Sequence, residues 1–454
     1  MPTIAAMSPS PRPLPAPPAA AVPARRPAWP LWLVVGVAGW AGVAALGVQL
    51  YSLVPRRAGF DLELLLGAGR RVAGGETPYD AGMLAGRAPS AVDLFYSYPP
   101  PVAQYLSLFA AIPSPVMLVA WGIAAGVGLL AVAVALAGLR ARTPTPGLRE
   151  HLRLVGLPVV AIAPFVFPFA IAGLFGNLDA LFPLLYGLML VGALGASPAS
   201  RFAGGAALAM AAVAKLHPAS MVIWFLVRGL RDRRRTPRGV RGSGRPAPVS
   251  GVPGPWIVAA SAAAVGLAIL VVSLIAGGVT PWLDYAAVLR AGSAAEVVDA
   301  RNIGPAAQLA LLVGGGESLG RLAQIVVLLV AVAGTAAAAW GRDDTVESFA
   351  WATVASLVIL PVTWFHYPVA LLPVAVAVWL RADGPGRRRV LGLFAAAMVV
   401  GVLAVGVPVL IWVSVALVLL AARLTAPAVI TELPFPRLEP SRISRFPAPG
   451  SDVR

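Results

Sequence analysis

The sequence predicts an all-α polytopic membrane protein with about eleven to thirteen transmembrane helices. Its residues are 59% hydrophobic and only 12% charged, whereas soluble domains carry about 25% charged residues. Apolar runs recur along the chain, and short clusters of arginine separate them. Lipid cannot satisfy free backbone groups, so the spans are expected to be helices.

Both ends of the chain differ from the middle. Residues 1–28 are rich in Pro and Ala, and residues 427–454 are rich in Pro and Arg. Prolines block helix hydrogen bonding, so we expect two disordered cytoplasmic tails around a membrane domain of residues 29–426. The apolar stretch from Trp29 to Val54 is too long for a signal-peptide core and is interpreted as an uncleaved first span.

The spans follow from the length of each apolar run, shortened where Gly, Pro or a polar residue interrupts it. Helices are expected near residues 31–53, 115–139, 154–173, 178–195, 202–215, 217–229, 256–277, 319–340, 348–362, 364–380, 390–406 and 408–423.

The arginines predict the orientation and favour a membrane protein over a nucleic-acid-binding one. They cluster in the tails and in the loops at 140–153, 228–245 and 381–389. Positively charged loops stay on the cytoplasmic side, so both termini are expected in the cytoplasm. The protein itself is expected in the cytoplasmic (inner) membrane. The formal charge of +16 is therefore attributed to topology, since no basic face with interleaved aromatic residues is visible.

The same orientation leaves segments 55–98 and 278–304 outside, and the first of these large loops is expected to carry short interfacial helices. The stretch "DLELLLGAGRRVAGG" (61–75) is apolar at Leu62, Leu65 and Leu66 and ends at two glycines. This pattern predicts an amphipathic helix on the membrane surface. Residues 96–115 contain too few apolar residues to span and have prolines at both ends, which favours a re-entrant or interfacial helix.

Unusual polar residues gather at the outer ends of the predicted spans. Ionisable groups at the membrane edge are costly unless they face a cavity or a partner, so their convergence predicts a polar pocket. The candidates are Asp61, Asn177, Asp179, Lys215, His217, Arg301 and His366. Simpler interpretations remain open: Asp61 as a helix cap, Asn177 and Asp179 as turn formers, and His366 as part of an interfacial aromatic belt.

Lys215 is the only lysine among the 35 basic residues, and all the others are arginines. A basic residue at a helix end needs only a positive charge, which this chain otherwise supplies as Arg. A compact ammonium with three rotatable donors suits a site where a planar guanidinium does not fit, and phosphate binding is one such task.

Several motifs are absent from the sequence. It has no cysteine, no Walker P-loop and no D-x-D motif beside a soluble domain; "RDDT" (342–345) is interpreted as a solvated loop. The sequence thus lacks the apparatus of a soluble nucleotide-sugar enzyme, and we expect neither a metal nor a cofactor.

Five segments carry a resemblance to a known family. They are "GFDLELLLGAGRRVAGGETPYD" (59–80), "FYSYPPPVAQYLSLFAAIP" (95–113), "GNLDALFPLLYGLML" (176–190), "AAVAKLHPA" (211–219) and "LPVTWFHYPVALLP" (360–373). In this order they resemble glycosyltransferase family 87, the polyprenol-phosphate-mannose-dependent mannosyltransferases of the GT-C class. The chain departs from the family in having no Gln before Asn177 and a single His, His366, in the last segment.

The resemblance implies a GT-C bundle that transfers mannose from polyprenyl phosphate, with inversion, to a glycolipid or glycan acceptor outside the membrane. A direct displacement needs one base, for which Asp61 is the candidate. Lys215, His366 and Arg301 are the candidates for binding the donor phosphate. Asn177, Asp179, His217 and Tyr79 are further pocket candidates. The partners are then the lipid-linked donor, the acceptor and membrane lipids, without nucleic acid.

Three alternatives stay open at this point. Another GT-C enzyme could transfer a pentose such as arabinose, or an aminosugar, from the same kind of carrier. A lipid or solute transporter also uses broken helices and polar residues in the membrane, but the large asymmetric outer loops and the lack of visible inverted repeats disfavour it. A scaffold without catalytic activity is favoured if Asp61 only caps a helix.

Overall fold

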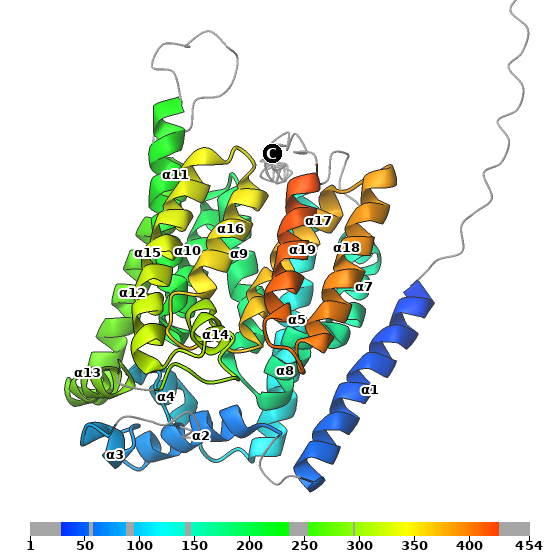
Figure 1. Ribbon diagram of the computed structural model, residues 1–454. Coiled ribbons are helices and arrows are strands. Elements are labelled where there is room, and N and C mark those ends of the chain that lie inside the picture. Colours follow the sequence, from blue (N-terminus) through cyan, green and yellow to red (C-terminus); the bar gives the residue numbers. More distant parts are fainter. Residues whose placement is uncertain are drawn as a thin grey trace, which may run out of the picture.

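The computed structural model describes residues 29–53, 58–87, 95–140, 147–235, 253–293 and 296–425. These residues form helices and turns, with no strand among them, and the all-α class is confirmed (Figure 1). The predicted tails, 1–28 and 427–454, lie outside the described residues.

Four helices of the described part are long and apolar enough to cross a membrane. They are α1 (Trp29–Leu53), α5 (Ser114–Arg140), α12 (Gly254–Gly277) and α15 (Glu317–Gly341). A fifth candidate is bent by 75° before Phe167 and comprises α6 (Leu148–His151), η1 (Leu152–Gly156), α7 (Leu157–Ile162), η2 (Ala163–Phe165) and α8 (Phe167–Phe175). Pro168, the second residue of α8, has no N–H to donate to the preceding turn, which explains the bend.

The other predicted spans correspond to shorter helices. These are α9 (Phe182–Leu194), α10 (Pro198–Ala214), α11 (Met221–Arg235), α16 (Thr345–Leu357), α17 (Leu372–Arg381), α18 (Gly384–Leu403) and α19 (Leu410–Leu424). Length and composition alone therefore support four or five spans, fewer than the predicted eleven to thirteen. In three cases a 3₁₀ turn precedes the helix: η3 (Leu178–Leu181) before α9, η4 (His217–Ser220) before α11 and η5 (Tyr367–Leu371) before α17.

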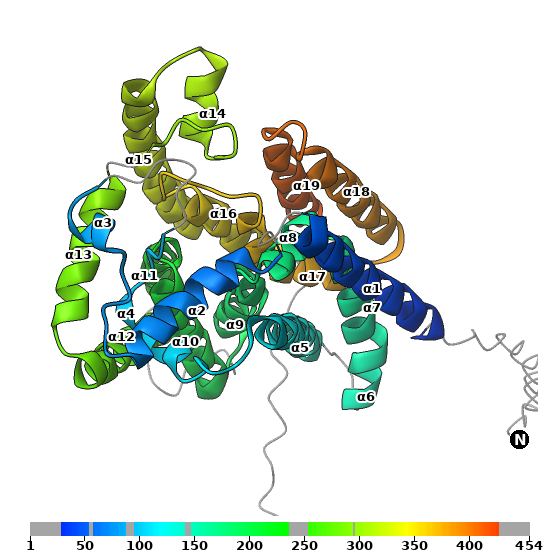
Figure 2. The same ribbon diagram turned by 90° about the horizontal axis from the view of Figure 1, so that it is seen from below.

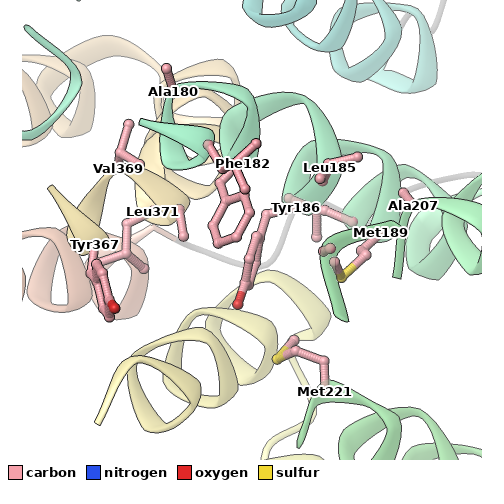
Figure 3. Packing of buried hydrophobic residues seen from close by; sticks show 14 of the residues in the cluster. Ala180, Phe182, Leu185, Tyr186, Met189, Ala207, Met221, Tyr367, Val369 and Leu371 are labelled. Carbon is pink, nitrogen blue, oxygen red and sulfur yellow. The ribbon is translucent and has the colours of Figure 1, made fainter. Parts of the chain in front are cut away.

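The centre of the bundle combines small residues with a large aromatic core. A Cβ on Gly192 of α9 would lie 2.9 Å from the Cα of Gly204 on α10, so only glycine lets these two helices approach so closely. At the start of α9, Phe182 and Tyr186 pack near Tyr367 in the close-packed cluster of Figure 3. This core fixes the turns η3 and η5 relative to each other.

One end of the bundle is covered by short helices, which Figures 1 and 2 show crossing the ends of the long ones. They are α2 (Phe60–Ala73), α3 (Ala81–Leu84), α4 (Pro100–Ser107) and α13 (Thr280–Ser293), with α14 (Pro305–Leu312) nearby. The expected helices at 61–75 and within 96–115 thus exist, and Leu62, Leu65 and Leu66 are buried. The sequence did not predict α13 or α14, because both are short and interrupt their apolar residues with polar ones.

The opposite end carries arginines, and there residues 342–345 form a turn that is partly solvated: the Asp343 side chain is 80% exposed, whereas that of Asp344 is 15% exposed. Arg231 and Arg235 both pair with Asp343. Asp344 pairs with Arg381 and its side chain accepts a hydrogen bond from the N–H of Glu347, which caps α16. The loop therefore ties three helix ends together.

Candidate active site

The site begins where α2 meets the end of α8. The N–H of Gly59 donates to the carbonyl of Leu174 at 2.9 Å. Gly176 ends α8 with φ +66°, and a Cβ there would lie 2.5 Å from the Cβ of Leu62. Glycine is required for both the backbone conformation and the close approach. These contacts bring Asp61 beside the turn that follows α8.

Four side chains form a continuous polar chain from this point. The Nδ2 of Asn177 donates to Oδ2 of Asp61 at 2.6 Å. The Oδ1 of Asn177 accepts from the N–H of Asp179 at 2.9 Å and from Nζ of Lys215 at 3.3 Å. Lys215 also donates to Oδ2 of Asp179 at 2.8 Å. One asparagine thus links the carboxylate at the edge of the bundle to the buried ion pair.

His366 joins the buried end of this chain. Its Nε2 lies 3.2 Å from the same Oδ2 of Asp179, although the N–H is not aimed closely enough for a hydrogen bond. The ammonium of Lys215 lies 4.3 Å from the centre of the Tyr367 ring, a cation–π contact. The side chains of Lys215 and Asp179 are 7% and 0% exposed, so water screens neither charge.

Burial, more than the neighbouring charges, sets the protonation of Asp61. Burial raises its pKa from 3.8 to about 6. The hydrogen bond from Asn177 and the charge of Lys215 oppose that shift, while the negative charge of Asp179 adds to it. A carboxylate with a pKa of about 6 is ionised at neutral pH and still accepts a proton readily, as a general base must.

Two simpler interpretations can now be decided. The cap of α2 is Gly59, and no side chain caps the helix, so Asp61 is not an N-cap. Asn177 does form its turn, because its side chain accepts from the N–H of Asp179. That role coexists with its contacts to Asp61 and Lys215, which a turn former does not need.

His217 lies close by but outside the polar chain. Its ring stacks on Tyr367 with centroids 5.2 Å apart and contacts Phe182 at 5.6 Å. It is buried among these rings. The structure thus brings His217 against the aromatic wall of the site rather than against Asp61.

Tyr79 is connected to the site through Tyr98. Its hydroxyl donates to the carbonyl of Tyr98 at 3.0 Å, and its ring stacks on Tyr285. The phenol of Tyr98 interacts electrostatically with Lys215 and Asp61; burial raises the pKa of Tyr98 and the charge of Lys215 opposes that shift. Tyr98 was missed as a site residue, although it lies in the second segment that carries the family resemblance.

Arg301 has different neighbours. It pairs with Asp299 at 3.0 Å, and its side chain is 51% exposed. The adjacent Asn302 is buried and holds this loop to the chain just before His366, by donating to the carbonyl of Pro361 and accepting from the N–H of Thr363. The role of Arg301 at the donor phosphate stays a prediction. Within the described residues no three His, Asp or Glu side chains are placed to hold a metal ion.

Comparisons with known proteins identify the family. No curated protein and no solved structure matches the chain. The model of glycosyltransferase family 87 matches residues 96–364, more than half of the chain. The matched range contains Asn177, Asp179 and Lys215, whereas Asp61 and His366 lie outside it. The chain therefore belongs to glycosyltransferase family 87 and is a membrane glycosyltransferase.

Proposed function

We propose that this glycosyltransferase transfers mannose, or a related sugar, from a polyprenyl-phosphate carrier to a lipid or glycan acceptor on the outer face of the cytoplasmic membrane. The family resemblance supports the donor class. The observation that carries the proposal is the polar chain from Asp61 through Asn177 to the Lys215–Asp179 pair. It combines a carboxylate suited to act as a base with a cation suited to a phosphate leaving group.

The two ends of the bundle support an outward-facing site. Asp61 lies at the end covered by α2 and α4, and the clustered arginines of α11 and the 342–345 turn lie at the other (Figure 1). Arginine-rich loops remain cytoplasmic. On the outer side no nucleotide sugar is supplied, which favours a lipid-linked donor.

The proposed reaction is a single displacement with inversion. The acceptor hydroxyl attacks the anomeric carbon while the bond from that carbon to the phosphate oxygen breaks. Asp61 takes the hydroxyl proton, and polyprenyl phosphate leaves with the bonding electrons. Oδ2 of Asp61 is held by Asn177, so Oδ1 is the oxygen that would receive the proton.

Cations and hydrogen-bond donors near the leaving phosphate would stabilise its growing negative charge. Lys215 and His366 are proposed for this task, with Arg301 as a third group from the outer loop. Since Lys215 already binds Asp179 and Asn177, a donor phosphate would replace one of these two partners. The apolar faces of the bundle would hold the isoprenoid tail.

Purified protein in liposomes, supplied with polyprenyl-phosphate mannose and glycolipid acceptors, tests the proposal. Asp61→Asn is expected to abolish transfer while the variant still binds the donor. Glu63→Gln is the matched control, because Glu63 lies on the same helix and pairs with Arg70 at the surface. Full transfer by Asp61→Asn would show that Asp61 is not the base. Transfer from an arabinose or aminosugar carrier alone would exclude mannose as the donor sugar. Accumulation of sugar inside sealed vesicles without transfer would favour a transporter.

A further inference from the structure

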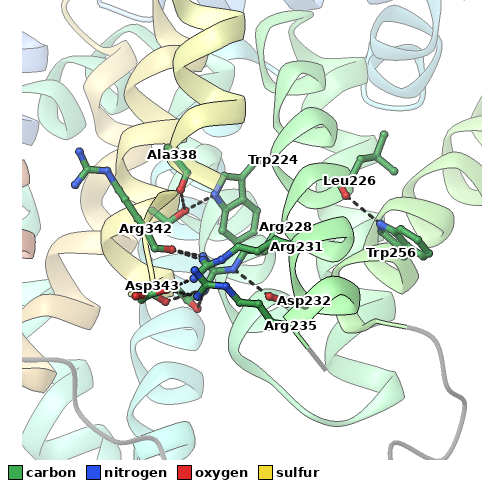
Figure 4. Close-up of polar contacts among 12 residues, drawn as sticks. Trp224, Leu226, Arg228, Arg231, Asp232, Arg235, Trp256, Ala338, Arg342 and Asp343 are labelled. Atoms are coloured by element: carbon green, nitrogen blue, oxygen red, sulfur yellow. Dashed lines mark hydrogen bonds and ion pairs between the residues drawn. The ribbon is translucent and has the colours of Figure 1, made fainter. Parts of the chain in front are cut away.

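A second polar feature lies at the arginine end, away from Asp61. It is a cavity of about 180 Å³ between the end of α9, the starts of α10, α12 and α16, and α11. Its charged lining residues are Arg201, Arg228 and Asp232. Figure 4 shows Arg228 and Asp232 on α11, together with the network they enter.

Arg228 is fully engaged in holding helices together. Its guanidinium donates to the carbonyls of Arg342 at 2.6 Å and Asp343 at 2.9 Å, and to the hydroxyl of Thr345 at 3.0 Å. Its Nε lies 3.8 Å from the carboxylate of Asp232. The one acid of the cavity lining is thus already paired with this arginine.

Arg201, the other arginine of the cavity lining, lacks such partners among the described residues. It forms no hydrogen bond or ion pair with any described residue, and its Nε is buried without a partner. The guanidinium packs against the first residue of α12, since a Cβ on Gly254 would lie 2.8 Å from that Nε. A half-buried cation without an anion is costly, so the site favours a negatively charged ligand.

The start of α12 adds positive charge to the cavity instead of neutralising Arg201. The N-terminus of α12 has no side-chain cap, and a helix N-terminus carries partial positive charge that attracts anions.

We infer that this cavity binds the phosphate headgroup of an anionic membrane phospholipid, with Arg201 as its principal ligand. Five helices begin or end around the cavity. The ends of the helices in a membrane bundle lie near the lipid headgroups. A guanidinium matches the geometry of phosphate oxygens better than any other side chain. Basic pockets between helices at the positive end of a membrane protein are typical sites for such lipids.

Native mass spectrometry of the delipidated full-length protein, titrated with phosphatidylglycerol or phosphatidylcholine, tests this inference. The protein is expected to retain one phosphatidylglycerol more tightly than phosphatidylcholine. Arg201→Gln should weaken that binding roughly tenfold, the loss of one charge-assisted contact. Arg149→Gln is the matched control, because Arg149 is exposed on α6, and it should bind as the unaltered protein does.

A second variant reaches the same group without removing it. In Gly254→Ala the new methyl group displaces the Arg201 guanidinium, whereas alanine itself favours the helix. The variant should therefore bind the lipid more weakly but keep the melting temperature of the lipid-free protein. Equal binding by Arg201→Gln and the unaltered protein would overturn the inference. Tight binding of inorganic phosphate or pyrophosphate that phosphatidylglycerol cannot displace would also overturn it, in favour of a soluble anion.

Discussion

The ammonium of Lys215 lies 2.8 Å from the carboxylate of Asp179, and both side chains are buried. Lys215 follows α10 and Asp179 lies in the turn before α9, so the pair joins two segments 36 residues apart. Its charges cancel in the resting protein. The single lysine of the chain therefore has a structural partner, and any phosphate it binds competes with that partner.

Removing one member of this pair should cost more than removing both. Asp179→Asn leaves the Lys215 charge buried and uncompensated, which destabilises proteins by roughly 3–5 kcal/mol. The double change Asp179→Leu with Lys215→Met should recover most of that stability but no transfer. Thermal unfolding in detergent, followed by tryptophan fluorescence, measures the first effect, and the liposome assay measures the second.

The exposed pair of Glu63 and Arg70, 3.6 Å apart, is the control for burial. Glu63→Gln should change the unfolding free energy by less than about 1 kcal/mol, as at other surface ion pairs. An Asp179→Asn variant as stable as the Glu63→Gln variant would show that the buried pair is not ionised. A double variant that transfers sugar would show that Lys215 has no part in the reaction.

The pH dependence of transfer should report the ionisation of Asp61. Only the carboxylate accepts a proton, so kcat/KM is expected to fall below pH about 6, the pKa of this group. Asn177→Ala removes the hydrogen bond that lowers this pKa, so the acid limb should move to higher pH. Initial rates between pH 5 and pH 9 measure the shift.

Trp121→Phe provides the control for that experiment. The indole of Trp121 donates to the backbone carbonyl of Asn177 at 3.0 Å, not to its side chain. This variant should lower stability and leave the acid limb in place. An acid limb that is unchanged in Asn177→Ala, or shifted equally in both variants, would mean that the limb belongs to another group.

Much of the site could be predicted because membrane sequences make polar residues conspicuous. Asp61, Asn177, Lys215 and His366 stand out against apolar surroundings at helix ends, and all four enter one network. Asp179 was identified as a candidate, but its pairing with Lys215 was not, since pairing depends on how η3 packs against the end of α10. Sequence spacing carries no information on that packing.

Other features were invisible for physical reasons. Tyr98 and Tyr367 resemble ordinary interfacial aromatic residues until the fold brings them next to Lys215. The ion pairs of the turn at 342–345 could not be predicted because its partners, Arg231 and Arg381, lie on helices distant in sequence. Several predicted spans correspond to helices shorter than the apolar run, because a 3₁₀ turn takes up its first residues, as η5 does before α17.

Asp61 should also make the stability of the protein depend on pH. Its folded pKa of about 6 exceeds the value of 3.8 expected without burial, so the folded state binds the proton more tightly than the unfolded state. The ionised group therefore destabilises the fold above pH 6, and protonation relieves this as the pH falls towards 4. Asp61→Asn should raise the melting temperature at pH 8 and, because pH 5 still lies above 3.8, roughly half as much at pH 5. A gain that is equal at both values would contradict the raised pKa.

Gly176 should be indispensable for joining α2 to the turn that holds Asn177. Alanine at φ +66° costs about 1–2 kcal/mol in a left-handed conformation, and its Cβ would lie 2.5 Å from the Cβ of Leu62. Gly176→Ala is therefore expected to lower the melting temperature and to reduce kcat by moving Asp61 away from Asn177. Gly173→Ala lies on the same helix with open space around it. This variant should keep both the melting temperature and kcat. Unchanged transfer by Gly176→Ala would show that catalysis does not depend on the contact between α2 and α8.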